Sequence, residues 1–106
     1  YEVHDIGIKA ILEKIPDDVN FYITVDADGM DPTIMPAVNA PTPGGLNWLQ
    51  IRELIHGIVK KGRVLGFDLV EISPSFEKGN TTLIHAERLI CNFIGAMVRA
   101  GYYDSK

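Results

Sequence analysis

Three aspartates follow an apolar segment and are the residues of this chain most able to do chemistry. The stretch ITVDADGMDPTIMP, residues 23–36, contains Asp26, Asp28 and Asp31. Two carboxylates about 4 Å apart repel each other by about 1 kcal/mol in water and about 4 kcal/mol at an effective dielectric constant near 20. A divalent cation bound to their oxygens offsets this repulsion. The stretch therefore indicates a metal site, although acids that only cap and turn a loop would give the same pattern.

Glu71 is the next candidate, because it lies in the otherwise largely apolar segment RVLGFDLVEI, residues 63–72. A carboxylate buried in such a segment needs a partner, since its isolated burial costs several kcal/mol or forces protonation. Two partners fit: a cationic group of a substrate, or a structural arginine such as Arg63 or Arg88. The same two interpretations apply to Asp68, which could also anchor a neighbouring loop.

Hydrophobic periodicity divides the chain into the elements that must position these acids. Apolar runs with little polar alternation predict strands over 20–25 and 63–72. Apolar residues that recur every three or four positions predict helices over 5–15, 47–60 and 81–100. A strand, a helix and a second strand in that order predict a right-handed crossover and a parallel sheet, so the fold class is α/β.

The parallel sheet predicts where the acids meet. Asp26 and Asp28 lie at the carboxyl end of the first strand and Glu71 at that of the second, so all three should emerge at one edge of the sheet. On an extended backbone, the side chains of Asp26 and Asp28 would also share a face. Two strands alone cannot make a parallel sheet with both faces covered, which predicts that the rest of the sheet lies outside this sequence.

Composition excludes several classes of function. The chain has 106 residues, 46% of them hydrophobic, and a net charge of -4, which is typical of one small domain or a piece of a larger one and argues against a nucleic-acid surface. No apolar stretch reaches the roughly 18 residues that span a bilayer, so we expect no membrane partner. The single cysteine, Cys91, suits a reducing, cytoplasmic environment, and we expect it to be a small core residue.

The remaining nucleophiles and histidines predict no catalytic residue. His4, His56 and His85 lie in no zinc-binding spacing, and His56 shares a helical stripe with Arg52 and Lys60 that indicates a solvated basic face. No glycine-rich phosphate loop is present.

The string TVDADGMDPTIMPAVNAPTPGGL, followed by GFDLVEISP, resembles the carboxyl-terminal portion of the ureohydrolases, the arginase and agmatinase family. That family has D-x-D-x-x-D-P after a strand, a later proline, G-G-L before a helix, and then D-x-x-E-x-x-P. The matching positions are Asp26, Asp28, Asp31, Pro32, Pro36, Gly44, Gly45, Leu46, Asp68, Glu71 and Pro74. The resemblance covers nearly the whole chain and implies an α/β/α three-layer fold with a parallel sheet. Residues 1–106 would be its carboxyl-terminal βαβα piece, a segment of a single ureohydrolase domain.

The resemblance also implies a function. Two Mn²⁺ ions would lie at the carboxyl edge of the sheet, with Asp26 bridging both, Asp28 binding one, and Glu71 accepting the guanidinium of the substrate. Hydroxide would attack the guanidinium carbon and release urea and an amine. Family members usually form trimers or hexamers, so a homo-oligomer is expected.

Departures from the family pattern leave other functions open. The family's other metal-binding segments, G-G-D-H and D-A-H-x-D, do not occur here, and the loop reads PAVNAPTPGG where many agmatinases have a G-T-x-x-P stretch. Agmatine is the first choice of substrate, ahead of guanidinobutyrate and guanidinopropionate. One alternative is a truncated, non-catalytic module that keeps the fold for assembly. A second alternative is a nucleotide-sugar transferase, in which D-x-D would be the metal-binding motif. The 106-residue piece alone is expected to be inactive.

Overall fold

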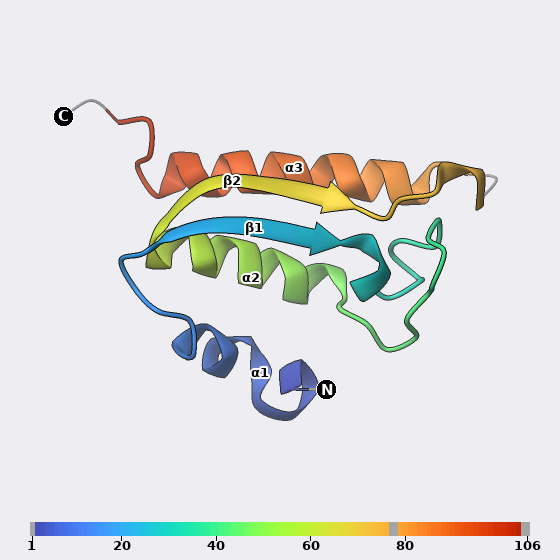
Figure 1. Cartoon of the computed structure of the whole chain (residues 1–106), viewed down its shortest axis with the longest axis horizontal. Helices are drawn as coiled ribbons and strands as arrows, with labels where there is room; N and C mark the ends of the chain where they lie inside the picture. Colours follow the sequence, from blue (N-terminus) through green and yellow to red (C-terminus); the bar gives the residue numbers. More distant parts are fainter. Residues whose placement is uncertain (1, 77–78, 105–106) are drawn as a thin grey trace.

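The computed structural model describes residues 2–76 and 79–104, and its elements follow the predicted order. The helices and strands in Figure 1 are α1 (Glu2–Glu13), β1 (Asn20–Asp26), the 3₁₀ turn η1 (Ala27–Gly29), α2 (Trp48–Lys61), β2 (Arg63–Val70), the 3₁₀ turn η2 (Pro74–Phe76) and α3 (Thr81–Arg99). The second strand is shorter than predicted, because the chain leaves the sheet at Val70 instead of at Ile72.

The two strands pair in parallel, as the crossover through α2 requires. The register runs from Asn20 opposite Arg63 to Asp26 opposite Val70, and it shifts once between Phe21 and Tyr22. Both arrows in Figure 1 point the same way, toward the loops that precede α2 and α3. The prediction of an α/β fold with a parallel sheet is confirmed.

One face of this sheet forms the core. Ile23, Val25 and Phe67 face α2 and α3, which lie side by side behind the strands in Figure 1. The Phe67 ring stacks on Phe93 of α3, with 4.0 Å between the ring centroids. Helix α1 packs against α2. The described helices therefore cover one face of the sheet.

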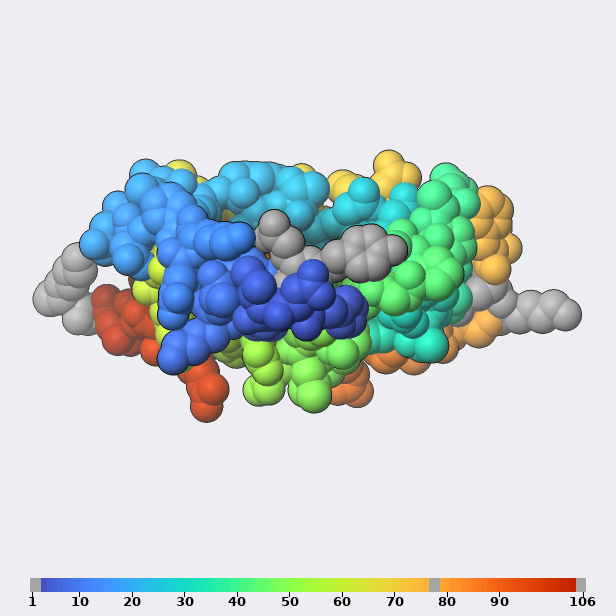
Figure 2. Space-filling model, turned by 90° about the horizontal axis from the view of Figure 1, so that it is seen from below, coloured from blue at the N-terminus to red at the C-terminus, as the bar shows by residue number. Residues whose placement is uncertain are grey.

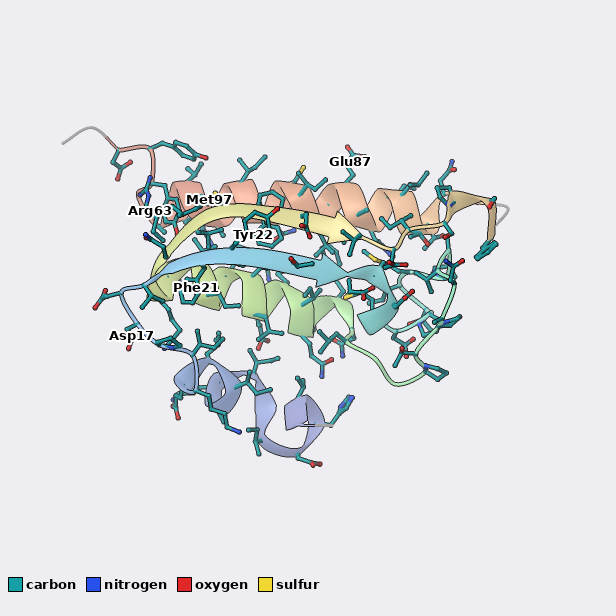
Figure 3. All side chains as sticks on the ribbon, in the orientation of Figure 1. Asp17, Phe21, Tyr22, Arg63, Glu87 and Met97 are labelled. Carbon is teal, nitrogen blue, oxygen red and sulfur yellow. The ribbon has the colours of Figure 1, made fainter. Side chains whose placement is uncertain are left out.

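The opposite face of the sheet carries exposed apolar side chains. Tyr22 is 65% exposed and Leu65 is 66% exposed, and Figure 3 shows Tyr22 in front of the strands. Helix α3 likewise has a second apolar stripe outside the core, formed by Leu83, Ile90 and Ile94. Contiguous exposed apolar surface is typical of protein–protein or membrane contacts and of ligand grooves.

Two expectations about the helices were wrong. Cys91 is exposed, because it lies about half a helical turn away from the buried Leu89 and Phe93. His56 is half-buried, and its Nε2 lies 3.1 Å from Oδ1 of Asn92 on α3. Helical spacing alone did not show that α3 covers this part of α2.

No helix in the described ranges combines the length and apolar character that crossing a bilayer requires.

Candidate functional site

The chain turns sharply where β1 ends, and this turn is built around Asp26. Asp26 is exposed, and its Oδ1 accepts the backbone N–H of Asp28 at 2.9 Å, which caps the 3₁₀ turn that begins at Ala27. The expectation that Asp26 and Asp28 share one face of an extended backbone is therefore wrong. Only Oδ1 takes part in the cap, so Oδ2 of Asp26 stays available to a ligand.

Asp28 has an oxygen that lacks a partner. Its Oδ1 is withdrawn from solvent and receives no hydrogen bond from the described residues. A buried carboxylate oxygen without a donor is unfavourable by about 1–3 kcal/mol or more. A bound cation would satisfy this oxygen, so the carboxylates of Asp28 and Asp26 fit a hard divalent ion.

Asp31 has a different role from the other two aspartates. Its Oδ1 accepts the backbone N–H of Thr33 at 2.9 Å and the Thr33 hydroxyl at 2.6 Å, and its Oδ2 accepts the N–H of Gly44 at 2.9 Å. These three hydrogen bonds lower the pKa of Asp31 below its ordinary value of 3.8, and the bond from the Thr33 hydroxyl has the largest effect. Asp31 therefore closes the loop 30–46, as the loop-capping interpretation expected for an acid in this stretch.

The ends of this loop are tied together next to the acids. The N–H of Asp31 donates to the carbonyl of Leu46 at 2.9 Å, and the N–H of Leu46 donates to the carbonyl of Gly29 at 3.0 Å. Gly45 is pressed against this junction, since a Cβ there would lie 2.7 Å from the Gly29 oxygen and 2.9 Å from the Asp31 nitrogen. This junction thus begins at Gly29, the last residue of the 3₁₀ turn that Asp26 caps.

A cavity of about 370 Å³ lies beside this junction, and its lining includes Val3, His4, Gly29 and Gly44. The Nε2 of His4 lies 3.2 Å from the carbonyl oxygen of Gly44, which joins the first turn of α1 to the loop. Figure 2 shows this start of α1 beside the loop residues that precede α2.

Glu71 emerges at the same edge of the sheet as Asp26. Asp26 pairs with Val70, the residue just before Glu71, so the predicted convergence of the two strand ends is confirmed. The expectation that Glu71 is buried is wrong: β2 ends at Val70, and Glu71 is exposed with a backbone φ of 67°. This left-handed conformation costs a residue with a side chain roughly 1–2 kcal/mol. Strain of this kind is often found where a side chain must be aimed at a ligand.

The structural arginines offered as partners do not pair with Glu71. Arg63 is the first residue of β2, where Figure 3 labels it, and Glu71 follows the last residue of that strand. The Arg63 guanidinium lies over the Tyr102 ring, 4.7 Å from its centroid. Within the described part of the chain, no ion pair joins Glu71 to Arg63 or Arg88. The carboxylate of Glu71 is therefore free for another cation.

Asp68 joins the two strands instead of anchoring a loop. The Tyr22 hydroxyl donates to its Oδ2 at 3.1 Å across the exposed face of the sheet, and this hydrogen bond raises the pKa of Tyr22. Its Oδ1 is withdrawn from solvent and, like that of Asp28, has no partner among the described residues.

The described residues supply only part of a metal site. No group of three or more metal-ligating side chains occurs in residues 2–76 and 79–104. Asp26 and Asp28 can each offer one oxygen, while Glu71 stands at the next strand end. The strings G-G-D-H and D-A-H-x-D, which hold the family's other metal ligands, do not occur in the sequence.

Three residues that support this site were missed from the sequence. Thr82 and His85 of α3 and Ser73 after β2 all make hydrogen bonds to the loop 30–46. Nothing in the sequence distinguishes Thr82 from Thr81. Their partners lie 36 to 51 residues away, so no local pattern could have revealed them.

Comparisons with known proteins place the chain in one family. The arginase family model matches residues 1–95. The chain is 33% identical to the agmatinase of Chromobacterium violaceum over 98 residues, which are 90% of this chain and 30% of that protein. It is 38% identical over 77 residues to an N(1)-aminopropylagmatine ureohydrolase of Thermus thermophilus, which covers 71% of this chain and 26% of that protein.

A solved structure agrees with these relatives. The agmatine ureohydrolase of Thermoplasma volcanium superposes with a TM-score of 0.82 at 34% identity, covering 99% of this chain and 35% of that one. The chain therefore spans about a third of the length of the relatives it matches. On the family model and the breadth of these matches, this chain belongs to the arginase family.

Proposed function

We propose that this chain carries the carboxyl-terminal half of the active site of a binuclear manganese ureohydrolase, which hydrolyses a guanidino compound to urea and an amine. The observation that carries the proposal is the solvent-shielded and unpartnered Oδ1 of Asp28, beside the free Oδ2 of Asp26 and at the same sheet edge as Glu71. Family membership supports it, because the relatives that match most of the chain are agmatinases and ureohydrolases by name.

Asp26 and Asp28 would hold the ions, and other segments would supply the remaining ligands. Divalent ions bound there would lower the pKa of water and so provide a nucleophile near neutral pH. Asp26 suits a bridging role, because its side chain is exposed and already held in place by the N–H of Asp28. Asp28 suits a single ion, because one of its oxygens is shielded from solvent.

Glu71 would bind the guanidinium group of the substrate. A carboxylate and a guanidinium form two parallel, charge-assisted hydrogen bonds, which fix the plane of the substrate as well as its position. The left-handed backbone at Glu71 turns its side chain out of the strand and away from the sheet pairing. Agmatine is the proposed substrate, since two of the three relatives reported above act on agmatine by name.

The proposal includes the setting of the enzyme. We propose a cytoplasmic homo-oligomer, a trimer or a hexamer, that acts on a small guanidino substrate and binds neither nucleic acid nor membrane. The exposed apolar side chains of Leu83, Ile90 and Ile94 support contact with further polypeptide.

Exchanging Asp26 for asparagine in the full-length protein that carries this chain tests the metal role. Asp26→Asn keeps an oxygen for the Asp28 N–H but removes the charge, so the fold should persist while manganese content falls from two ions per chain to one or fewer. Urea release should fall by about 100-fold or more, since removal of a charged group that stabilises a transition state costs this much or more. The matched control is Asp17→Asn, which removes a carboxylate at the far end of β1. Full manganese content and normal turnover in Asp26→Asn would reject the proposal.

A non-catalytic module is the second candidate, favoured by the absence of a three-ligand group among the described residues. The two candidates differ in what precedes this chain in its parent protein. G-G-D-H and D-A-H-x-D segments there would favour the enzyme, and their absence would favour the module.

A further inference from the structure

Ala37, at the middle of the loop 30–46, is held on both sides by groups from outside the loop. Its N–H donates to the Thr82 hydroxyl of α3 at 2.9 Å, and its carbonyl accepts the N–H of Ser73 at 2.7 Å. Both Ala37 and Thr82 are 0% exposed, so water cannot replace these bonds. The middle of the loop is thus tied to α3 and, through Ser73, to the segment that begins with Glu71.

A second tie lies three residues earlier in the loop. The Nδ1 of His85 is 2.7 Å from the carbonyl oxygen of Ile34, which is itself buried. A carbonyl oxygen only accepts hydrogen bonds, so Nδ1 must carry the hydrogen. The His85 ring also packs beside Trp48, with 5.8 Å between ring centroids, and so connects the loop, the start of α2 and the start of α3.

The hydrogen bonds of Thr82 and His85 add to those that already join the two ends of the loop. Asp31 and Gly45 hold the base of the loop beside the turn of Asp26 and Asp28, but these contacts leave open where its middle lies. Ile34, Met35 and Val38 are buried in the core, and Thr82 and His85 add two hydrogen bonds from α3 to this segment. Since Ser73 is two residues from Glu71, the same contacts set how far the loop stands from Glu71.

We infer that Thr82 and His85 are positioning residues: they fix the middle of the loop 30–46 against α3 and so hold one wall of the substrate site in register with Glu71. This inference rests on the proposed function for the nature of the ligand. The anchoring itself is a property of the fold and can be measured without any substrate.

Hydrogen exchange at the Ala37 amide is the direct test. Thr82→Val keeps the shape of the side chain but leaves the buried Ala37 N–H without an acceptor, so this amide should exchange about tenfold faster or more. Thr82→Ser keeps the hydroxyl and should restore slow exchange. The amide of Phe67 in β2 should not change in either variant, which separates local release of the loop from general unfolding.

Two substitutions of His85, one that keeps the hydrogen-bond donor and one that removes it, form a matched pair. Asparagine can place its amide nitrogen close to the position of Nδ1, so His85→Asn should keep the loop protected, whereas His85→Phe should raise exchange at residues 34–38. In the full-length enzyme, Thr82→Val should raise KM for the guanidino substrate severalfold, and Thr82→Ser should restore it.

Equal exchange at Ala37 in Thr82→Val and Thr82→Ser would overturn the inference. If the full-length protein releases urea from no guanidino compound, the proposed function is wrong. Hydrogen exchange at the Ala37 amide would still show whether Thr82 anchors the loop 30–46.

Discussion

At the scale of single residues, the three aspartates after β1 divide into two roles. Asp31 has its oxygens occupied by the backbone and side chain of Thr33 and by the N–H of Gly44. Asp26 and Asp28 each keep one oxygen without such a bond. The repulsion among three neighbouring acids is thus met partly by hydrogen-bond donors of the loop, and in the proposed function the cations would act on the first two only.

The role of Asp31 predicts an acid-sensitive contribution to stability. Its pKa is lowered in the folded protein, so the group stabilises the fold above its ordinary pKa, and this contribution is lost as pH falls through the lowered value. Asp31→Asn should therefore be less stable than the wild type near about pH 6, and the difference should shrink below about pH 3. Urea denaturation followed by Trp48 fluorescence measures both. The control is Asp5→Asn on the exposed side of α1, and a difference that stays constant with pH would contradict the role.

Glu71 offers a separate prediction about strain. Glycine adopts its φ of 67° freely, but it also loses more backbone entropy on folding. With about 1–2 kcal/mol of strain relieved and about 0.4–1 kcal/mol of entropy opposing it, Glu71→Gly should stabilise the protein by about 0.5–1 kcal/mol. Glu71→Ala keeps the strained backbone and should leave stability nearly unchanged, while both variants should lose guanidino binding. Equal stability of the two variants in urea denaturation would show that the conformation carries no strain.

At the scale of elements, the loop 30–46 is held at its base by backbone hydrogen bonds and at its middle by hydrogen bonds from α3. The base depends on a close approach of backbones: Met30 and Leu46 form an isolated parallel bridge, and Gly45 has no room for a side chain. A long loop without such ties would be mobile and a poor wall for a binding site.

Gly45→Ala should therefore destabilise the protein by about 1–3 kcal/mol, since the Cβ would meet backbone atoms that cannot move aside. Gly29→Ala is the matched control from the same junction, because a Cβ there meets nothing within 4 Å. Thermal unfolding of the two variants side by side measures the effect, and a Gly45→Ala protein as stable as Gly29→Ala would show that the junction can relax.

At the scale of the whole molecule, the described chain is a layer of helices on one face of a two-stranded sheet, with apolar residues exposed on the other face. Tyr22 and Leu65 lie on this face, and Glu87 in Figure 3 points from α3 away from the sheet. The relatives are about three times as long, and their additional chain has no counterpart here.

The 106-residue chain by itself should consequently bind Mn²⁺ weakly and release no urea, because its described residues include no group of three metal-ligating side chains. Isothermal titration with Mn²⁺ and a urea assay with agmatine measure these two properties. The double variant Asp26→Asn and Asp28→Asn serves as the control for non-specific metal binding. Urea production by this chain that depends on Mn²⁺ would contradict the expectation.

The sequence by itself determined the order of elements, the parallel pairing and the meeting of Asp26 and Glu71 at one sheet edge. These follow from hydrophobic period and from the geometry of a strand–helix–strand crossover, which are properties of neighbouring residues. The three aspartates and the spacing of Asp68, Glu71 and Pro74 also sufficed to indicate the arginase family.

Only the tertiary structure decided that Glu71 is exposed, that Asp31 closes a loop, that Asp28 has an unpartnered oxygen, and that Thr82 and His85 hold the loop. Each of these depends on atoms from residues far apart in the chain or on where one strand stops pairing. Such contacts leave no periodic trace in the sequence, because one hydrogen bond across 45 or 51 residues constrains only its two ends.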